Sequence, residues 1–315
     1  MRIVYLDSYA LNPGDLDFSA LNALGEVELY DRTATTEEAI ARIGDAETVV
    51  VNKVIMNEEI FTACKNLKFI SVTATGYNTV DVEGARRHGI TVSNVPAYST
   101  PSVAQHIFAL ILELCIRTGD HSNAVKEGTW QKCPDYTFHI SNLIELSGKT
   151  LGLIGMGAIG CATAKIAQAF GMKVICYHSS QSLDGVEHVE LDELLSESDV
   201  ISLCCPLKED NKRIIRRETI EKMKDGVIII NTARGGLIDE NDLAEAIKSG
   251  KVYGAGIDVL TEEPPVNSSP LINLDNVIVT PHIAWAPKEA RSRLLDVTVK
   301  NIQAYFDGKP QNVVN

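Results

Sequence analysis

The sequence predicts an α/β protein made of two doubly wound parallel sheets. Short runs rich in Val and Ile alternate with polar, helix-like stretches through residues 1–98, and from Leu151 the alternation starts again. Strands and helices that alternate in this way form mainly parallel sheets with helices on their faces. The length of 315 residues allows about two domains of ordinary size, one for each half.

The first half contains strand-like runs bounded by Gly, Asn, Asp or Pro, and helical patterns separate several of them. The runs are residues 1–7, 27–31, 48–52, 67–74 and 90–95, and the helical patterns are 35–44, 57–66 and 81–89. The second half has further runs at residues 151–155, 173–177, 200–207, 226–233, 253–260 and 276–282. Each half therefore has the strand–helix repeats that a parallel sheet requires.

A long apolar helix marks the predicted crossing between the two domains. It lies within residues 98–119, where Ser99 or Thr100 can cap the first turn and Pro101 fits inside it. The rest of the run is almost continuously apolar, so we expect a helix buried between two layers. Residues 287–308 carry apolar side chains at helical spacing, which predicts an amphipathic helix that returns to the first domain. The predicted domains are 1–98 with 287–315, and 99–286.

The composition is globular and argues against several classes of protein. Hydrophobic residues make up 45% and charged residues 23%, and the net charge is -13. Such a charge argues against a nucleic-acid partner and against acidic membranes. The seven cysteines show no metal-ligand CxxC spacing, and their odd number favours reduced thiols. Because the cysteines lack metal-ligand spacing, we expect no bound metal. Because we find no signal-peptide core and no apolar run long enough to span a bilayer, we expect a soluble cytoplasmic protein.

A glycine pattern in the second half predicts a dinucleotide site. Gly155, Gly157 and Gly160 form a GxGxxG motif that follows an apolar strand, opens a helix and precedes a second strand. In that context the glycines permit a tight turn, a close approach of the pyrophosphate and close helix–strand packing. The helix N-terminus, with Ala158 and Ile159, presents free N–H groups to the phosphates. A glycine-rich turn that binds no ligand is the alternative.

The end of the next strand leaves the choice of cofactor open. His178 lies where an Asp or Glu usually accepts hydrogen bonds from the ribose of NAD and repels the 2′-phosphate of NADP. His178, Ser179 and Ser180 do not repel a phosphate, although no Arg or Lys is adjacent to bind it. We therefore expect NAD and NADP both to be accepted. The alternative is that all three residues are merely solvated.

Three later strands end in side chains with acid–base or anion-binding chemistry. Arg234 follows one apolar run, Asp258 and then Glu263 follow the next, and His282 follows the last. Ligands of open α/β sheets bind beyond the carboxyl ends of the strands, so these side chains can converge beside a nicotinamide. Histidine suits a general acid–base, a carboxylate stabilises its imidazolium, and an arginine fork holds a substrate carboxylate. The set predicts hydride transfer with a 2-oxo or 2-hydroxy acid, whereas each residue alone has a structural alternative.

Together these motifs resemble the D-isomer-specific 2-hydroxyacid dehydrogenases over essentially the whole chain. The carrying segments are GLIGMGAIG, SLCCPL, NTARGG, GAGIDVLTEEPP and TPHIAWA, in order and at familiar separations. Within the family, SVTATGYNTVD, NVPAYSTPSVAQ and PHIAWA are most similar to glycerate dehydrogenases, also called hydroxypyruvate reductases. The resemblance implies a Rossmann-type cofactor domain inserted into a discontinuous, flavodoxin-like substrate domain, and a homodimer formed through the cofactor domain. It also implies reduction of hydroxypyruvate or glyoxylate to D-glycerate or glycolate.

The resemblance also assigns roles to single residues. His282 is implied as the acid–base, Glu263 as its partner and Arg234 as the substrate anchor, while Asp258 is implied to hold the nicotinamide carboxamide. The other implied substrate residues are Ala74, Thr75 and Gly76, through their backbone N–H groups, and Trp285 near the substrate entrance. The implied cofactor residues beyond the glycine loop, His178 and Asp258 are Ser179, Cys205, Pro206, Thr232, Ala233, His282 and Ala284.

Two departures and several alternatives qualify this assignment. Cys204 stands where many relatives have His, and His178 replaces the usual acid. A D-lactate-like dehydrogenase and a phosphoglycerate dehydrogenase are alternatives within the family, although the extra C-terminal domain of the latter has no room after residue 315. Glu263 disfavours a formate dehydrogenase, which uses an amide there. An NAD-sensing protein-binding corepressor, or a degenerate cofactor-binding scaffold, are alternatives of another class.

Overall fold

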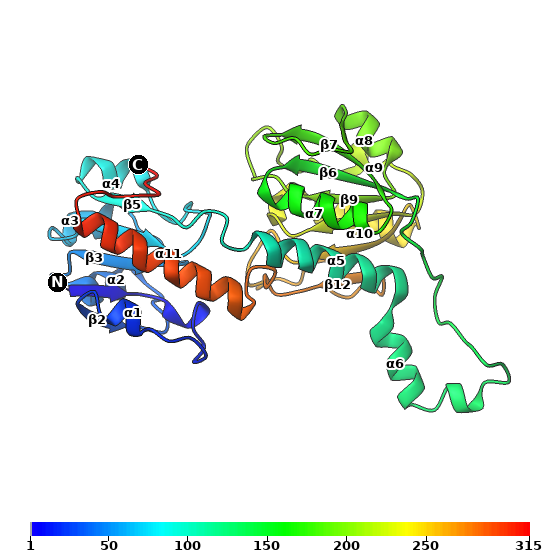
Figure 1. Ribbon diagram of the computed structural model, residues 1–315, viewed down its shortest axis with the longest axis horizontal. Helices are drawn as coiled ribbons and strands as arrows, with labels where there is room; N and C mark the ends of the chain where they lie inside the picture. The colour runs from blue at the N-terminus through cyan, green and yellow to red at the C-terminus, as the bar shows by residue number, and fades with distance from the viewer. Residues whose placement is uncertain (1) are drawn as a thin grey trace. The chain divides into compact units, whose positions relative to one another are not determined.

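The computed structural model describes residues 2–315, and the chain divides into two compact units. Unit 1 comprises Met1–Ser99 and Ala286–Asn315, and unit 2 comprises Thr100–Trp285. The N-terminal strands and the C-terminal helix therefore belong to the same unit, blue and red in Figure 1.

Unit 1 is a five-stranded parallel sheet with the strand order β2-β1-β3-β4-β5. This is the flavodoxin-like order, as predicted. The strands are β1 (Arg2–Tyr5), β2 (Glu26–Leu29), β3 (Thr48–Val51), β4 (Phe69–Val72) and β5 (Thr91–Ser93). The helices are η1 (Ser8–Ala10), α1 (Ser19–Asn22), α2 (Thr36–Ile43), α3 (Glu58–Ala63), α4 (Val82–Arg87) and α11 (Lys288–Phe306).

Local sequence explains where the short helices of unit 1 begin. The side chains of Thr35, Asn57 and Asp81 accept hydrogen bonds from backbone N–H groups in the first turns of α2, α3 and α4. Asn, Asp and Thr are favoured at this position because they satisfy N–H groups that have no partner within the helix. These three polar residues, which lie between the strand-like runs, are therefore the N-caps of the helices.

Helix α11 belongs to unit 1 and packs against its sheet. Leu294 and Ile302 are fully buried, and the ring of Tyr305 stacks on Phe69 of β4 with 4.4 Å between centroids. Arg291 donates to both carboxylate oxygens of Asp15, at 2.6 and 2.7 Å, so the helix is also tied to the N-terminal segment. The first domain is therefore discontinuous in sequence.

Unit 2 is a seven-stranded parallel sheet with the order β12-β11-β10-β9-β6-β7-β8. Counted from β6, this is the Rossmann order 3-2-1-4-5-6 with one strand added, as predicted. Its strands are β6 (Thr150–Met156), β7 (Lys173–Ser179), β8 (Val186–His188), β9 (Val200–Leu203), β10 (Val227–Asn231), β11 (Val252–Ile257) and β12 (Val277–Val279). The edge strand β8 was not predicted, because its three partly or fully exposed residues carry no apolar run.

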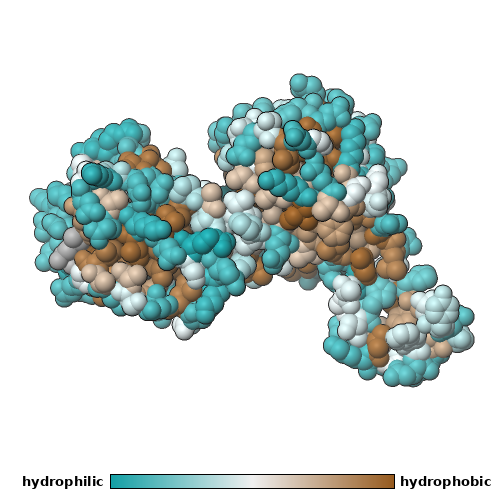
Figure 2. All heavy atoms as spheres, viewed as in Figure 1, coloured by the Kyte–Doolittle hydropathy of each residue, from teal (hydrophilic) through white to brown (hydrophobic). Residues whose placement is uncertain are grey.

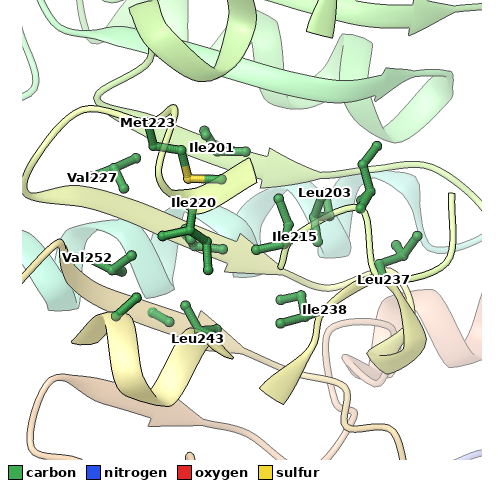
Figure 3. Close-up of a cluster of buried hydrophobic side chains, with 14 of the residues drawn as sticks. Ile201, Leu203, Ile215, Ile220, Met223, Val227, Leu237, Ile238, Leu243 and Val252 are labelled. Atoms are coloured by element: carbon green, nitrogen blue, oxygen red, sulfur yellow. The ribbon is translucent and has the colours of Figure 1, made fainter. Parts of the chain in front are cut away.

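Helices cover both faces of the unit 2 sheet. They are α5 (Thr100–Ile116), α7 (Ala158–Ala169), α8 (Leu191–Glu197), α9 (Arg217–Ile220), η3 (Gly235–Leu237) and α10 (Glu240–Lys248). Two further helices, α6 (Thr118–Lys126) and η2 (Trp130–Lys132), follow α5 in the chain, and α6 projects away from the sheet (Figure 1). One buried cluster joins β9, β10 and β11 to α8, α9 and α10, and Figure 3 shows its Ile, Leu and Val side chains. A second buried cluster contains side chains of α5 and α7. Buried residues occur along most of the length of α5, as expected. No helix in residues 2–315 has the length and apolar character needed to cross a membrane.

Candidate active site

Two glycines of the GxGxxG motif are required by close backbone packing. Gly155 has a φ of +97°, and a Cβ there would lie 2.7 Å from the Cβ of Cys205. A Cβ on Gly160 would lie 2.6 Å from the carbonyl oxygen of Gly155. A side chain at Gly155 would push the turn away from the cysteines that follow β9, and one at Gly160 would push α7 away from the turn. Both glycines therefore allow the close packing of the turn.

Gly157 differs from the other two because the space beside it is open. It is the N-cap of α7, and the atom nearest to where its Cβ would stand is the Oγ of Ser180, at 3.9 Å. Ala158 is exposed and no acidic residue lies in the first turn of the helix. An open approach to an uncapped helix N-terminus fits a pyrophosphate group, which the N–H groups and the helix dipole stabilise. The residues present therefore fit a dinucleotide.

The end of β7 carries exposed polar side chains and a serine, Ser179, whose hydroxyl is bonded within its own loop. His178 is exposed with a φ of +54°, and its ring lies 4.1 Å from that of Tyr177. The Oγ of Ser179 is bonded to the carbonyl oxygens of Met156 and Gln181 and accepts from the N–H of Gln181. Ser179 is therefore engaged within the loop, which leaves His178 and the exposed Ser180 as the more accessible polar side chains.

The two adjacent cysteines follow β9 at the same edge of the sheet. The N–H of Cys204 donates to the carbonyl oxygen of Ile154, and Cys205 packs against Gly155. Burial raises the pKa of the Cys204 thiol to about 12 and also raises the pKa of Cys205. Both thiols stay protonated at neutral pH, so they pack as small apolar side chains and not as nucleophiles. All seven cysteines of the chain are free.

Asn231, which was not among the predicted residues, shapes the turn that carries Arg234. Its side chain is fully buried, accepts a hydrogen bond from the N–H of Ala233 and donates to the carbonyl oxygen of Arg234. Its own carbonyl oxygen accepts from the N–H of Asp258. Arg234 is exposed, and one nitrogen of its guanidinium donates a hydrogen bond to the carbonyl oxygen of Ala233. The other N–H groups of the guanidinium are available to a ligand.

Gly235 brings the Arg234 turn into contact with the segment that leads to Glu263. A Cβ on Gly235 would lie 2.0 Å from the carbonyl carbon of Leu260, so only glycine fits there. The N–H of Leu260 donates to the Oε1 of Glu263 at 3.1 Å. Leu260 therefore contacts both the turn after β10 and the segment after β11.

Glu263 and His282 form the pair that the sequence predicted. The Oε2 of Glu263 lies 2.6 Å from the Nδ1 of His282, and the side chains are 32% and 27% exposed. A carboxylate accepts, so Nδ1 carries the proton and Nε2 is left to exchange a proton with a ligand. His282 has a φ of +54°, and its backbone N–H donates to the carbonyl oxygens of Asp258 and Thr280. The backbone as well as the carboxylate thus fixes the position of the imidazole.

Asp258 holds the loop on which His282 lies. Its buried carboxylate accepts from the Oγ1 of Thr280 at 2.6 Å and from the N–H groups of Ile283 and Ala284 at 2.8 and 3.0 Å. Burial by itself would raise the pKa of Asp258, but the hydrogen bonds, with that of His106 the largest, lower it below its usual value. The carboxylate therefore stays ionised inside the protein.

His106 from α5 completes this network, and it too was not among the predicted residues. Its Nε2 lies 3.0 Å from the Oγ1 of Thr280 and 3.4 Å from the Oδ1 of Asp258. Because the hydroxyl proton of Thr280 is given to Asp258, Nε2 must be the donor. A histidine within a largely apolar helix was the signal available for His106, and the tendency of Asn to form Asx-turns was the signal for Asn231.

The remaining predicted residues are divided between the two units. Ala74, Thr75 and Gly76 form a loop after β4 in unit 1, and the others lie in unit 2. Ala284 is buried, and Trp285 is partly exposed. Pro206 is exposed, while Ile159, Thr232 and Ala233 are partly exposed.

Comparison with known proteins identifies the family. Residues 108–284 match the family described as D-isomer specific 2-hydroxyacid dehydrogenase, NAD binding domain. A hydroxypyruvate reductase of Blautia hydrogenotrophica is 53% identical over 321 residues, covering 100% of both chains. A glycerate dehydrogenase of Methylorubrum extorquens is 41% identical over 315 residues, covering 99% of this chain and 98% of that protein.

A solved structure shows the same fold at full length. It is an acyclic imino acid reductase in complex with NADPH and D-Arg, 34% identical, with a TM-score of 0.87 and coverage of 100% of both chains. The predicted fold, nicotinamide cofactor and enzyme class are confirmed by these matches. The chain belongs to the D-isomer specific 2-hydroxyacid dehydrogenase family.

Proposed function

We propose that this enzyme reduces hydroxypyruvate or glyoxylate to D-glycerate or glycolate. The observation that carries the proposal is the hydrogen-bonded pair of His282 and Glu263, which leaves the Nε2 of His282 available for a proton transfer. Leu260 connects this pair to the turn that carries the exposed Arg234, because it contacts Gly235 and donates to Glu263. The full-length hydroxypyruvate reductase and glycerate dehydrogenase relatives support this substrate class over the D-lactate, phosphoglycerate and corepressor alternatives.

The proposed chemistry is a hydride transfer coupled to a proton transfer. When bound, the reduced nicotinamide supplies the hydride that forms the new C–H bond at C2 of the 2-oxo acid. The Nε2 of His282 gives its proton to the carbonyl oxygen and takes one back in the oxidation direction. The carboxylate of Glu263, held by the N–H of Leu260, stabilises the charge that the imidazole carries before it donates.

We infer that the substrate carboxylate is bound by the backbone N–H groups of Ala74, Thr75 and Gly76 and that Arg234 anchors and polarises the carbonyl. A guanidinium presents donors in a planar fork that matches carboxyl and carbonyl oxygens. From the resemblance to the family, we also propose that Trp285 lies near the substrate entrance.

The cofactor is proposed to lie along the carboxyl ends of the unit 2 strands. The residues assigned to it are Gly155, Gly157, Ala158, Ile159, Gly160, His178, Ser179, Cys205, Pro206, Thr232, Ala233, Asp258, His282 and Ala284. The open space at Gly157 supports the pyrophosphate position. Because no acid stands at His178, we propose that NADP is accepted as well as NAD, and a relative of the same fold in complex with NADPH is consistent with this.

We further propose that the enzyme is a cytoplasmic homodimer that assembles through unit 2. Arg117, with a φ of +50°, ends α5 and directs residues 117–143 into an arm that projects from the rest of unit 2 (Figure 1). Apolar side chains on this arm are exposed, and Figure 2 shows apolar surface there among hydrophilic atoms. The most exposed are Trp130, Tyr136, Ile140 and Leu143, at 51%, 90%, 46% and 56%. A second copy of the chain would bury them.

The direct test is to measure oxidation of NADH and NADPH with glyoxylate, hydroxypyruvate, pyruvate and 2-oxoglutarate. We expect the highest kcat/KM with hydroxypyruvate or glyoxylate. A clear preference for pyruvate or 2-oxoglutarate, or no turnover with any of the four, would contradict the proposal.

His282→Ala should lower kcat by about 10²–10⁴-fold, because no group remains to transfer the proton. NADH affinity, measured by fluorescence titration, should stay within about twofold of the wild-type value. Glu263→Gln should also lower kcat, and Glu262→Gln, the same change at the exposed neighbour, serves as its control. Near-normal turnover of His282→Ala would remove its assigned role.

Arg234→Lys should raise the KM for the 2-oxo acid by about tenfold or more, because an ammonium cannot form the two parallel bonds of a guanidinium. Steady-state kinetics at saturating NADH measure this effect. Arg213→Lys is the matched control, since Arg213 is exposed and pairs with Asp239. Wild-type kinetics in Arg234→Lys would show that another group anchors the substrate.

Substitution of two glycines should separate cofactor binding from stability. Gly157→Ala has room for its Cβ but places it where the pyrophosphate approaches, so NADH affinity should fall about tenfold without a change in Tm. Gly160→Ala meets the carbonyl oxygen of Gly155 and should lower the free energy of unfolding by about 1–3 kcal/mol. Unchanged NADH affinity in Gly157→Ala would contradict the assigned site.

His178→Asp should raise the ratio of kcat/KM for NADH to that for NADPH by about tenfold or more. A carboxylate accepts from the ribose hydroxyls and repels the 2′-phosphate, and Asp tolerates the left-handed backbone found here. His188→Asp adds the same charge on the exposed edge strand β8 and should leave the ratio unchanged. An equal ratio in both variants would show that residue 178 does not select the cofactor.

A further inference from the structure

The loop after β4 in unit 1 is fixed by its carbonyl groups. The carbonyl oxygen of Ala74 accepts from the N–H of Val95 at 3.0 Å, and that of Thr75 accepts from the Nδ2 of Asn94 at 2.8 Å. The Oγ1 of Thr75 donates to the carbonyl oxygen of Val95 at 2.9 Å. Two successive peptide groups of the loop are therefore bonded to the same neighbouring segment, residues 94–95.

This arrangement determines where the N–H groups of Thr75 and Gly76 point. In a trans peptide the C=O and the following N–H point in opposite directions. Because the carbonyl groups of Ala74 and Thr75 both face residues 94–95, both N–H groups point away from that segment. Within residues 2–315 neither N–H donates a hydrogen bond to the protein. Two adjacent donors aimed to one side suit the two oxygens of a carboxylate.

The backbone of Asn94 is hydrogen-bonded to two other asparagines, Asn301 and Asn312. Its side chain and backbone are buried, with 9% of the residue exposed. Its N–H donates to the carbonyl oxygen of Asn312 at 3.1 Å, and its carbonyl oxygen accepts from the Nδ2 of Asn301 at 2.8 Å. The Oδ1 of Asn301, which is fully buried on α11, accepts in turn from the Nδ2 of Asn312 at 2.8 Å. The three asparagines thus form one network that ends at the carbonyl oxygen of Thr75.

We propose that Asn94 is a positioning residue for substrate binding, backed by Asn301 and Asn312. It fixes the peptide group between Thr75 and Gly76 so that the Gly76 N–H stays aimed at the substrate carboxylate. The inference rests on the proposed function, which places that carboxylate at residues 74–76. Without the Asn94 amide the peptide group can rotate, and the donor must be reoriented each time the substrate binds.

The test compares Asn94→Asp with Ser93→Ala. Asn94→Asp keeps the side-chain volume but places an oxygen against the carbonyl oxygen of Thr75, so the KM for hydroxypyruvate or glyoxylate should rise about tenfold or more. NADH affinity should stay within about twofold. Ser93→Ala removes the neighbouring bond to the carbonyl oxygen of Gln311, which ties the same strand to the same C-terminal segment, and should leave the KM unchanged.

A second variant covers the case in which Asn94→Asp does not fold. Asn312 is exposed with a φ of +53°, so Asn312→Gly suits the backbone and removes only the outermost amide of the network. It should raise the KM by about threefold while Tm stays close to that of Ser93→Ala. An unchanged KM in the variants that fold, or an equal KM rise in Ser93→Ala, would overturn the proposal.

Binding of oxamate, an unreactive analogue of a 2-oxo acid, separates this inference from the proposed function. If the wild type reduces none of the 2-oxo acids but binds oxamate, and Asn94→Asp binds it more weakly than Ser93→Ala does, the proposed reaction fails and the role of Asn94 stands. If the wild type is active and Asn94→Asp keeps its oxamate affinity and KM, the role of Asn94 fails alone. A wild type that neither turns over nor binds oxamate contradicts both.

Discussion

The hydrogen bonds to the buried carboxylate of Asp258 are the interactions on which the rest of the candidate site depends. The carboxylate is bonded to Thr280 and to the N–H groups of Ile283 and Ala284, so it fixes both sides of the loop that carries His282. A buried charge is costly unless hydrogen bonds compensate it. Here the compensating donors are the loop itself and His106, so any movement of the loop would leave the charge unsatisfied. Because movement of the loop would remove hydrogen bonds from a buried charge, the burial of Asp258 keeps the loop in one conformation.

Close backbone contacts extend this rigidity to the other strand ends of unit 2. Gly235 lets the Arg234 turn touch Leu260, whose N–H holds Glu263, and Gly155 lets the cofactor turn touch Cys205. Each of these contacts uses backbone atoms of at least one partner, so it depends less on side-chain rotamers than a contact between two side chains does. In unit 1 the loop at residues 74–76 is fixed in a similar way, through its carbonyl groups. Both units therefore present their functional groups from backbone that is held by hydrogen bonds.

Much of the fold followed from local pattern. The apolar runs and the polar stretches between them predicted the parallel sheets correctly. The apolar residues at helical spacing near the C-terminus lie on a helix, residues 288–306, and several of them are buried. The edge strand β8 was missed, since an exposed strand needs no apolar residues. The residue roles in the site stay predictions. Ser179 shows how a predicted contact residue can already be engaged by the loop around it.

The sequence by itself determined the two-unit α/β architecture, the glycine turn and the types of side chain at the strand ends. These features depend on periodicity and on residues close together in the chain, so they can be read along it. Only the tertiary structure decided that His106 donates to Thr280, 174 positions away, and that Asn301 and Asn312 support Asn94, 207 and 218 positions away. Such partners are selected by packing between distant elements, because each buried polar group must find a donor or acceptor wherever the fold places it.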